Sequence, residues 1–261
     1  MPLPIKLIST DFDGTLFAEF ENPPISRRLE NLIGDMQSRG AKWVINTGRD
    51  MSSLMEALAR ARISIQPDYL VLVEREIYEH DGVRYAPVEP WNTACARDHA
   101  ELFALVRPAV SELTEWVNSR FRATVYQDAY SPFCLIAGNN GEADLIHDQL
   151  TAFCERFPQL TVVRNDVYAR FSHAAYNKGT ALAELSRRQS LTAAAVFAAG
   201  DHLNDLPMLS SNYARWLVAP DNAIEPVKVA VVRQEGFVSG LNHSEGVADG
   251  LEHHLALAQL Q

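Results

Sequence analysis

The chain alternates short apolar runs with segments in which apolar residues recur every three or four positions. Runs at 5–10, 43–47 and 69–73 are rich in large and β-branched apolar residues, which predicts buried strands. Between them, the spacing over 26–39 is that of an amphipathic helix, and a second helix is expected to begin at Ser53. This alternation is typical of a parallel sheet covered by helices.

The pattern changes in the middle of the chain. Residues 77–85 predict a β-hairpin, since the Asp81-Gly82 pair is a strong two-residue turn signal. A long helix over 95–117 and another over 142–157 are accompanied by paired strands, which indicates an α+β module with an antiparallel sheet. The predicted strands of this block are 123–127, 133–137, 160–164 and 167–171.

The alternation of strands and helices resumes after residue 172. The expected elements are a helix over 178–188, a strand over 193–199, a short helix over 204–210, a strand over 215–219 and a final helix over 244–258. We therefore predict an α/β fold: a Rossmann-like parallel sheet core in three layers (1–83 and 173–261), with a smaller α+β cap domain inserted into it (84–172).

Composition narrows the classes of function. Hydrophobic residues make up 47% of the 261 residues and charged residues 21%, which are ordinary values for a globular protein. The net charge of −10 disfavours nucleic acid and membrane surfaces as partners. With no apolar run approaching a membrane span and no leader-like start, we predict a cytoplasmic protein. An anionic ligand would need its own local cation and amides.

The first strand ends abruptly at two acids, Asp11 and Asp13. In an extended segment these side chains point to the same face, where two carboxylates repel each other unless a cation lies between them. Mg²⁺ suits such a pair because it binds carboxylates while keeping positions for water and phosphate. The alternative is a solvated turn, since Asp and the following Gly14 are also common turn residues.

A second acidic motif follows the strand over 193–199. Asp201 would join the earlier pair at the carboxyl ends of neighbouring parallel strands, where three acids can hold one divalent cation. Asn204 or Asp205 would either bind the ion directly or orient its ligands through hydrogen bonds. Either could instead cap the next helix, but capping does not explain Asp201. His202 is interpreted as a wall or capping residue of the site.

Two further positions favour an anionic ligand. Thr47 follows a strand, so its hydroxyl and the backbone amide of Gly48 can meet a phosphate oxygen at a helix start. Lys178 opens a helix, where its charge opposes the helix dipole unless an anion lies nearby. A turn threonine and a solvated lysine are the alternatives.

In chain order, the candidates form the motifs Asp11-Phe-Asp13-Gly-Thr15, Thr47-Gly-Arg49, Lys178-Gly179 and Gly200-Asp201-x-x-Asn204-Asp205. This set resembles the haloacid dehalogenase superfamily, specifically its Cof-like sugar-phosphatase group, whose cap is inserted between the second and third motifs. One departure is the segment Val73-Glu74-Arg75-Glu76, where relatives usually have an Asn-Gly pair.

The resemblance implies a role for each matching residue. Asp11 would be the nucleophile that forms an aspartyl-phosphate, and Asp13 would protonate the leaving oxygen and then activate water. Mg²⁺ would be held by Asp11, Asp201 and the backbone carbonyl of Asp13. Lys178 and Thr47 would bind the phosphate, with Thr15 ordering the turn.

The sequence thus predicts a Mg²⁺-dependent phosphatase acting on a small phosphate ester, foremost a sugar phosphate. A phosphotransferase or phosphomutase would use the same aspartyl-phosphate, and a non-catalytic binding module would keep the fold alone. Arg49, Arg164 and Arg170 are candidates for substrate selection, or are simply solvated.

Overall fold

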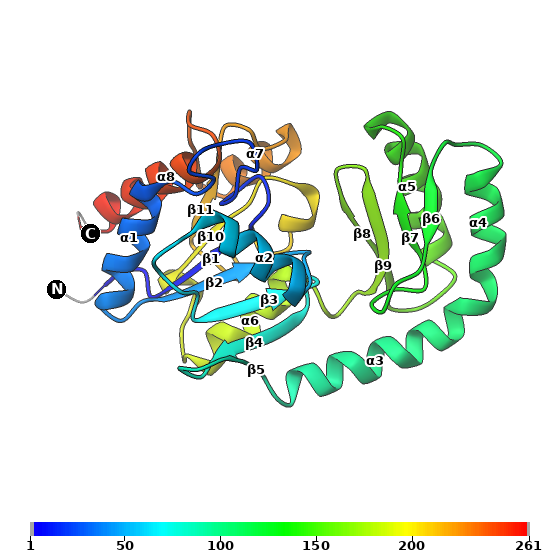
Figure 1. Cartoon of the computed structure of the whole chain (residues 1–261), viewed down its shortest axis with the longest axis horizontal. Coiled ribbons are helices and arrows are strands. Elements are labelled where there is room, and N and C mark those ends of the chain that lie inside the picture. The colour runs from blue at the N-terminus through cyan, green and yellow to red at the C-terminus, as the bar shows by residue number, and fades with distance from the viewer. Residues whose placement is uncertain (1–2, 260–261) are drawn as a thin grey trace. The chain divides into compact units, whose positions relative to one another are not determined.

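The computed structural model describes residues 3–259, and its chain divides into two compact units (Figure 1). The larger unit takes the chain up to Val88 and again from Lys178, and the smaller unit is Glu89–Asn177. The smaller unit begins after the predicted boundary at residue 84, because the whole β-hairpin stays in the main sheet, and it extends past residue 172 to Asn177. Residues 1, 2, 260 and 261 of the predicted core lie outside the described part.

The larger unit is built on an eight-stranded sheet in the order β12-β11-β10-β1-β2-β3-β4-β5. Its strands are parallel from β12 to β3, and the hairpin β4–β5 adds an antiparallel edge. The α/β fold predicted from the alternation is therefore confirmed. The strands are β1 (Leu7–Thr10), β2 (Lys42–Asn46), β3 (Tyr69–Leu72), β4 (Glu76–His80), β5 (Tyr85–Pro87), β10 (Val196–Ala199), β11 (Trp216–Ala219) and β12 (Phe237–Val238).

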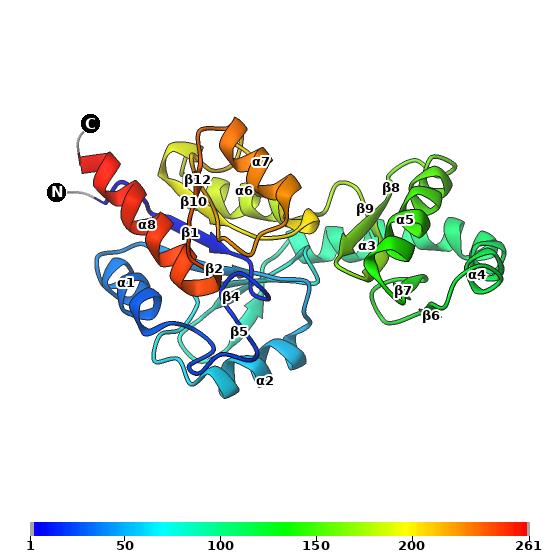
Figure 2. The same cartoon turned by 90° about the horizontal axis from the view of Figure 1, so that it is seen from above.

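Helices cover both faces of this sheet, giving three layers. Figure 2 shows α1, α2 and α8 on one side and α6 and α7 on the other. Apolar stripes of α1, α2 and α8 pack on alternate residues of the buried strands, such as Ile8, Ile45 and Phe197. The helices are α1 (Arg27–Ser38), α2 (Met51–Ala61), α6 (Lys178–Arg188), α7 (Glu225–Arg233) and α8 (His243–Gln259). Within residues 3–259, no helix is long and apolar enough to cross a membrane.

Several predicted element boundaries were wrong for local reasons. Helix α2 begins before Ser53, because the Asp50 side chain caps it by accepting from the Ser53 amide at 2.8 Å. Only the short 3-10 turn η3 (Leu203–Asp205) forms where a helix over 204–210 was expected. Pro207 lies two residues after this turn and has no N–H to continue the helical hydrogen bonding. A second turn, η2 (Ala193–Ala195), precedes β10, and α7 and β12 were not predicted.

The smaller unit is an α+β module with its own apolar core. Its four-stranded antiparallel sheet has the order β6-β7-β9-β8. The long helix predicted over 95–117 is broken, because Pro108 interrupts the helical hydrogen bonding. The elements are α3 (Trp91–Val106), η1 (Arg107–Ala109), α4 (Val110–Asn118), β6 (Thr124–Tyr126), β7 (Cys134–Ile136), α5 (Asn140–Cys154), β8 (Leu160–Asn165) and β9 (Tyr168–His173).

Candidate active site

The candidate site forms where the chain leaves two adjacent parallel strands, β1 and β10. Asp11 directly follows β1, and its amide donates to the Ala199 carbonyl at the end of β10 at 2.9 Å. Asp201 follows β10 after one glycine. From β1 the sheet grows outward in one direction through β2, and from β10 in the other. Such a switch point is where open α/β sheets bind ligands.

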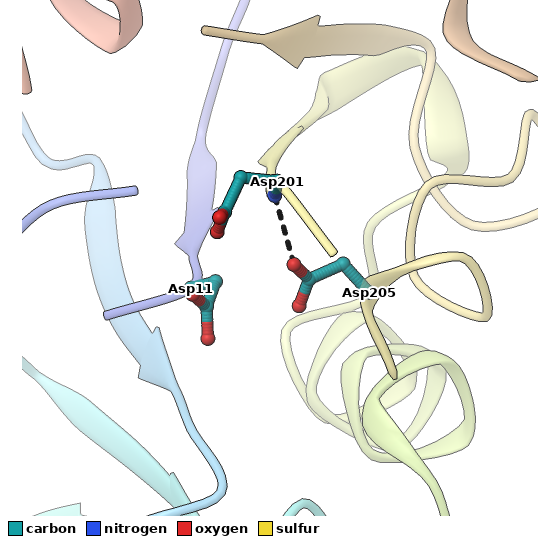
Figure 3. A group of neighbouring side chains, drawn as sticks. All are labelled: Asp11, Asp201 and Asp205. Carbon is teal, nitrogen blue, oxygen red and sulfur yellow. Dashed lines mark hydrogen bonds between the residues drawn. The ribbon is translucent and has the colours of Figure 1, made fainter. Parts of the chain in front are cut away.

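Three carboxylates meet at this point, contributed by Asp11, Asp201 and Asp205 (Figure 3). Each offers an oxygen, and these oxygens all lie within 4.8 Å of one another. Burial, followed by the negative charge of Asp205, raises the pKa of Asp11 well above its ordinary value. The same causes raise the pKa of Asp201 to about 7. The cluster therefore carries more negative charge than its surroundings balance.

Lys178 supplies the buried positive charge beside this cluster. It is the first residue of α6 and is fully buried, and its Nζ donates to Asp11 Oδ1 and to Asp205 Oδ1, both at 2.6 Å. Burial by itself would lower the pKa of Lys178, but the charges of Asp11, Asp205 and Glu74 outweigh it and raise that pKa. The predicted conflict with the helix dipole is thus relieved by two carboxylates.

The Asp205 side chain fixes the loop after β10 through hydrogen bonds to its backbone. Its Oδ2 accepts from the amides of Asp201 and His202, at 2.9 and 3.0 Å, while its Oδ1 is held by Lys178. His202 lies in the capping position of η3. Gly200 has to be small here, since a Cβ atom on it would lie 2.5 Å from the Asp205 Cβ. Both oxygens of Asp205 are engaged, which suits a residue that holds the other acids in place.

Thr15 positions Asp201 from the first motif. Its hydroxyl donates to Asp201 Oδ1 at 2.7 Å. Gly14, at φ +78°, turns the chain beside it, and a Cβ on Gly14 would lie 2.4 Å from Asp201 Oδ2. From the sequence Thr15 was expected only to order the turn, and its link to Asp201 depends on a contact far along the chain.

Asp13 lies apart from the acidic cluster. Arg49 binds it through two bonds, Nε to Oδ2 at 2.8 Å and Nη2 to Oδ1 at 2.7 Å. The strand β1 ends at Thr10, so Asp11 and Asp13 both lie in the loop that follows it. The positive partner of the Asp13 side chain is therefore Arg49, which was expected to select substrate.

Thr47 and Gly48 lie where β2 ends. Thr47 is buried, and its hydroxyl oxygen accepts from the amide of Arg49 at 3.1 Å, which leaves its O–H available as a donor. The amide of Thr47 donates to the Val71 carbonyl on β3. The loop is thus held against the neighbouring strand.

The two arginines predicted in the smaller unit differ in their surroundings. Arg164 is buried and donates to Asp144 Oδ1 at 2.5 Å and to the Asp166 carbonyl at 2.9 Å. These contacts give Arg164 a structural role within the smaller unit. Arg170 lies between Ala169 and Phe171, both of which face the apolar core. Alternation along β9 therefore places Arg170 on the opposite face of that sheet.

One residue of the site was noticed in the sequence only as a departure from relatives. Glu74 is buried, and its Oε1 accepts from Asn204 Nδ2 at 2.8 Å. Asn204, predicted to support the metal ligands, therefore binds Glu74 through its side chain and directly precedes Asp205 of the acidic cluster in the chain. The local pattern at residues 73–76 carries no sign of this pairing.

The donor set fits Mg²⁺. Asp11 and Asp201 offer carboxylate oxygens, the ligands that this hard cation prefers, and Asp205, whose oxygens are engaged by Lys178 and two amides, adds negative charge beside them. Burial, followed by the charge of Asp205, raises the pKa values of Asp11 and Asp201, so added positive charge would favour their ionised forms. A divalent cation would supply that charge.

Family comparisons agree with this geometry. Residues 119–251 match the haloacid dehalogenase-like hydrolases, and residues 4–119 match the sucrose-6F-phosphate phosphohydrolases. The first match covers more than half of the chain, which therefore belongs to the haloacid dehalogenase-like hydrolase family. The resemblance inferred from the motifs is confirmed.

Individual relatives are similar over nearly the whole chain. The 5-amino-6-(5-phospho-D-ribitylamino)uracil phosphatase YcsE of Bacillus subtilis is 24% identical, over 95% of each chain. The sucrose-phosphatase of Synechocystis sp. PCC6803, solved with sucrose and phosphate, has a TM-score of 0.74 at 16% identity, over 96% of this chain and 98% of the other. A putative HAD/COF-like hydrolase of Plasmodium vivax has a TM-score of 0.70 at 18% identity, over 98% and 97%. The chain is an enzyme of this hydrolase family, and the family matches support phosphatase activity.

Proposed function

We propose that this hydrolase is a Mg²⁺-dependent phosphatase that removes the phosphate of a small phosphorylated metabolite, foremost a sugar phosphate, through a covalent intermediate on Asp11. The observation that carries the proposal is the buried Asp11 carboxylate, held by Lys178 beside the acids Asp201 and Asp205. The match to sucrose-6F-phosphate phosphohydrolases over 4–119 supports the substrate class.

Asp11 opens the reaction. One of its carboxylate oxygens attacks phosphorus, the bond from phosphorus to the leaving oxygen breaks, and an aspartyl-phosphate forms. Attack requires the ionised carboxylate, which Lys178 favours through its short bond to Oδ1. Dividing the reaction at a covalent intermediate replaces one high barrier with two lower ones.

Asp13 moves the protons. It protonates the leaving oxygen in the first step, and in the second it takes a proton from the water that attacks phosphorus and releases Asp11. Arg49 holds both Asp13 oxygens, so Asp13 gives up part of that ion pair when it carries a proton. The ion pair keeps the side chain oriented between the two steps.

Charge on the phosphoryl group is balanced by fixed donors. Lys178, the Thr47 hydroxyl and the Gly48 amide would face the phosphoryl oxygens. Thr15 donates to the Asp201 carboxylate, and Asp205 accepts from the Asp201 amide. Asp11 and Asp201 would hold Mg²⁺, which would supply further positive charge to the site. Preorganised charge of this kind is the main contribution to phosphoryl transfer. We assign the choice of substrate to the smaller unit, in which Arg170 lies on the sheet face opposite the apolar core.

The proposal is tested by assaying the purified protein against a panel of phosphorylated metabolites and an aryl phosphate. We expect free phosphate to be released with Mg²⁺, turnover to stop with EDTA, and Mg²⁺ to restore it. Activity indifferent to both treatments would contradict the metal site. Conversion of one sugar phosphate into its isomer, with little free phosphate, would instead identify a phosphomutase.

A further inference from the structure

The turn that follows β3 has an unusual backbone. Val73 and Glu74 have φ values of +44° and +67°, a region that β-branched and long side chains rarely adopt. The turn is fastened to the loop after β2, since the amide of Val73 donates to the Arg49 carbonyl at 3.0 Å and that of Glu74 to the Thr47 carbonyl at 2.9 Å. Residues held in such a conformation without glycine often serve a site.

The Glu74 side chain is directed into the molecule. It is 6% exposed, although an isolated buried carboxylate is costly. Its Oε1 accepts from Asn204 Nδ2, and its charge raises the pKa of Lys178 together with Asp11 and Asp205, while burial opposes them. Glu74 therefore interacts with three parts of the site. Its amide binds the Thr47 carbonyl, its carboxylate binds the Asn204 amide, and its negative charge stabilises the protonated form of Lys178.

This contact fixes which way the Asn204 carboxamide lies. A carboxylate only accepts hydrogen bonds, so Glu74 selects the amide nitrogen, and the amide oxygen must point away from it. Asn204 is 7% exposed, and its Oδ1 has no hydrogen-bond partner among residues 3–259. A buried, unpartnered acceptor next to Asp205 is ready to bind a donor.

We propose that Glu74 is a positioning residue of the phosphatase reaction, which holds Asn204 so that its amide oxygen accepts from a hydroxyl group or water in the site. This inference rests on the proposed function for its kinetic consequence. Because an amide oxygen cannot donate, it does not bind an unprotonated phosphate oxygen. The acceptor suits the hydroxyl of a substrate or a water molecule.

A double-mutant cycle tests whether Glu74 acts through Asn204. Glu74→Ala, Asn204→Ala and the double variant are compared in kcat and KM on an aryl phosphate with Mg²⁺. We expect Glu74→Ala to lower kcat/KM by about 10- to 100-fold, the usual loss when a supporting partner of a site is removed. In the Asn204→Ala background, Glu74→Ala should cost almost nothing more.

Two further variants separate the hydrogen bond from charge and folding. Glu74→Gln keeps a carbonyl acceptor for Asn204 and should retain most of the activity. Glu76→Ala is the matched control, because the Glu76 carboxylate accepts from the Tyr78 hydroxyl at 3.1 Å instead, and it should resemble the wild type. An equal loss from Glu74→Ala in both backgrounds, or a Glu74→Gln variant as impaired as Glu74→Ala, would overturn the proposal.

A readout that does not depend on turnover keeps this inference separate from the proposed function. With ¹⁵N-asparagine labelling, the Asn204 side-chain NH₂ signals are identified by their loss in Asn204→Ala. We expect these protons to be protected from solvent exchange in the wild type and in Glu74→Gln, and unprotected in Glu74→Ala. Unchanged protection in a folded Glu74→Ala protein would contradict the inference. A wild type with protected signals but no phosphatase activity would contradict only the proposed function.

Discussion

Lys178 determines the charge balance of the site at the scale of single residues. It is the buried cation that contacts both Asp11 and Asp205. From the sequence we predicted its position at the start of a helix, with either a nearby anion or solvent as its partner. The identity of that anion could not be predicted, because its contacts come from residues that the sheet topology brings together.

Replacing Lys178 by Met should therefore destabilise the protein strongly. The change leaves buried carboxylates without their partner, and breaking a buried pair in this way costs about 3–5 kcal/mol. The matched control is Lys42→Met, since Lys42 is 44% exposed where it pairs with Asp68, and such surface pairs contribute about 1 kcal/mol or less. Urea unfolding in EDTA measures both. Equal losses for the two variants would contradict the buried network.

At the scale of elements, the sequence predicts best those helices and strands whose formation depends on neighbouring residues in the chain. The bounds of helices α1 and α6 (Lys178–Arg188) were predicted closely. Apolar periodicity and the Ser26 cap of α1 involve only residues that are close together in the sequence. The two-residue strand β12 was missed, since only its pairing with β11 defines it. The same limit applies to Glu74, whose partner Asn204 is 130 residues away.

Helix α8 carries a histidine that should make stability depend on pH. Burial is the main cause that lowers the pKa of His254. Its Nε2–H donates to the Leu217 carbonyl at 3.1 Å, and Nδ1 is buried without a partner among residues 3–259, so the folded state favours the neutral ring. The unfolded chain then binds more protons below about pH 6.5, so stability falls as the pH is lowered through that value.

Comparison with His254→Gln isolates this effect. We expect the wild type to lose up to about 1.4 kcal/mol more than the variant between pH 7.5 and 5.5, because a glutamine amide can keep the bond to Leu217 without titrating. Denaturant unfolding at the two pH values measures the difference. A loss that is the same in both proteins would exclude His254 as the cause.

At the scale of the whole molecule, the smaller unit is one continuous segment whereas the larger unit is formed from two. Glu89–Asn177 has its own apolar core, with Phe133 and Phe171 fully buried. The sequence predicted an insertion over 84–172 from a change in the pattern of strands and helices, and pairing of the hairpin with the main sheet is a long-range contact that this pattern does not contain.

This organisation predicts that residues 89–177 fold when expressed alone. A segment of this size with a closed core can be stable by itself. We expect cooperative thermal unfolding by circular dichroism, dispersed NMR signals and no phosphatase activity, because Asp11 and Lys178 belong to the larger unit. A fragment that is unfolded at low temperature would show that its core depends on the rest of the chain.

The central claim is that Asp11 is the nucleophile, and its most direct test is Asp11→Asn. Asparagine keeps the shape of the side chain, and Lys178 keeps its bond to Asp205, so the melting curve should change little. We expect phosphate release from an aryl phosphate in the presence of Mg²⁺ to be abolished. A folded Asp11→Asn protein that retains substantial turnover would contradict the account.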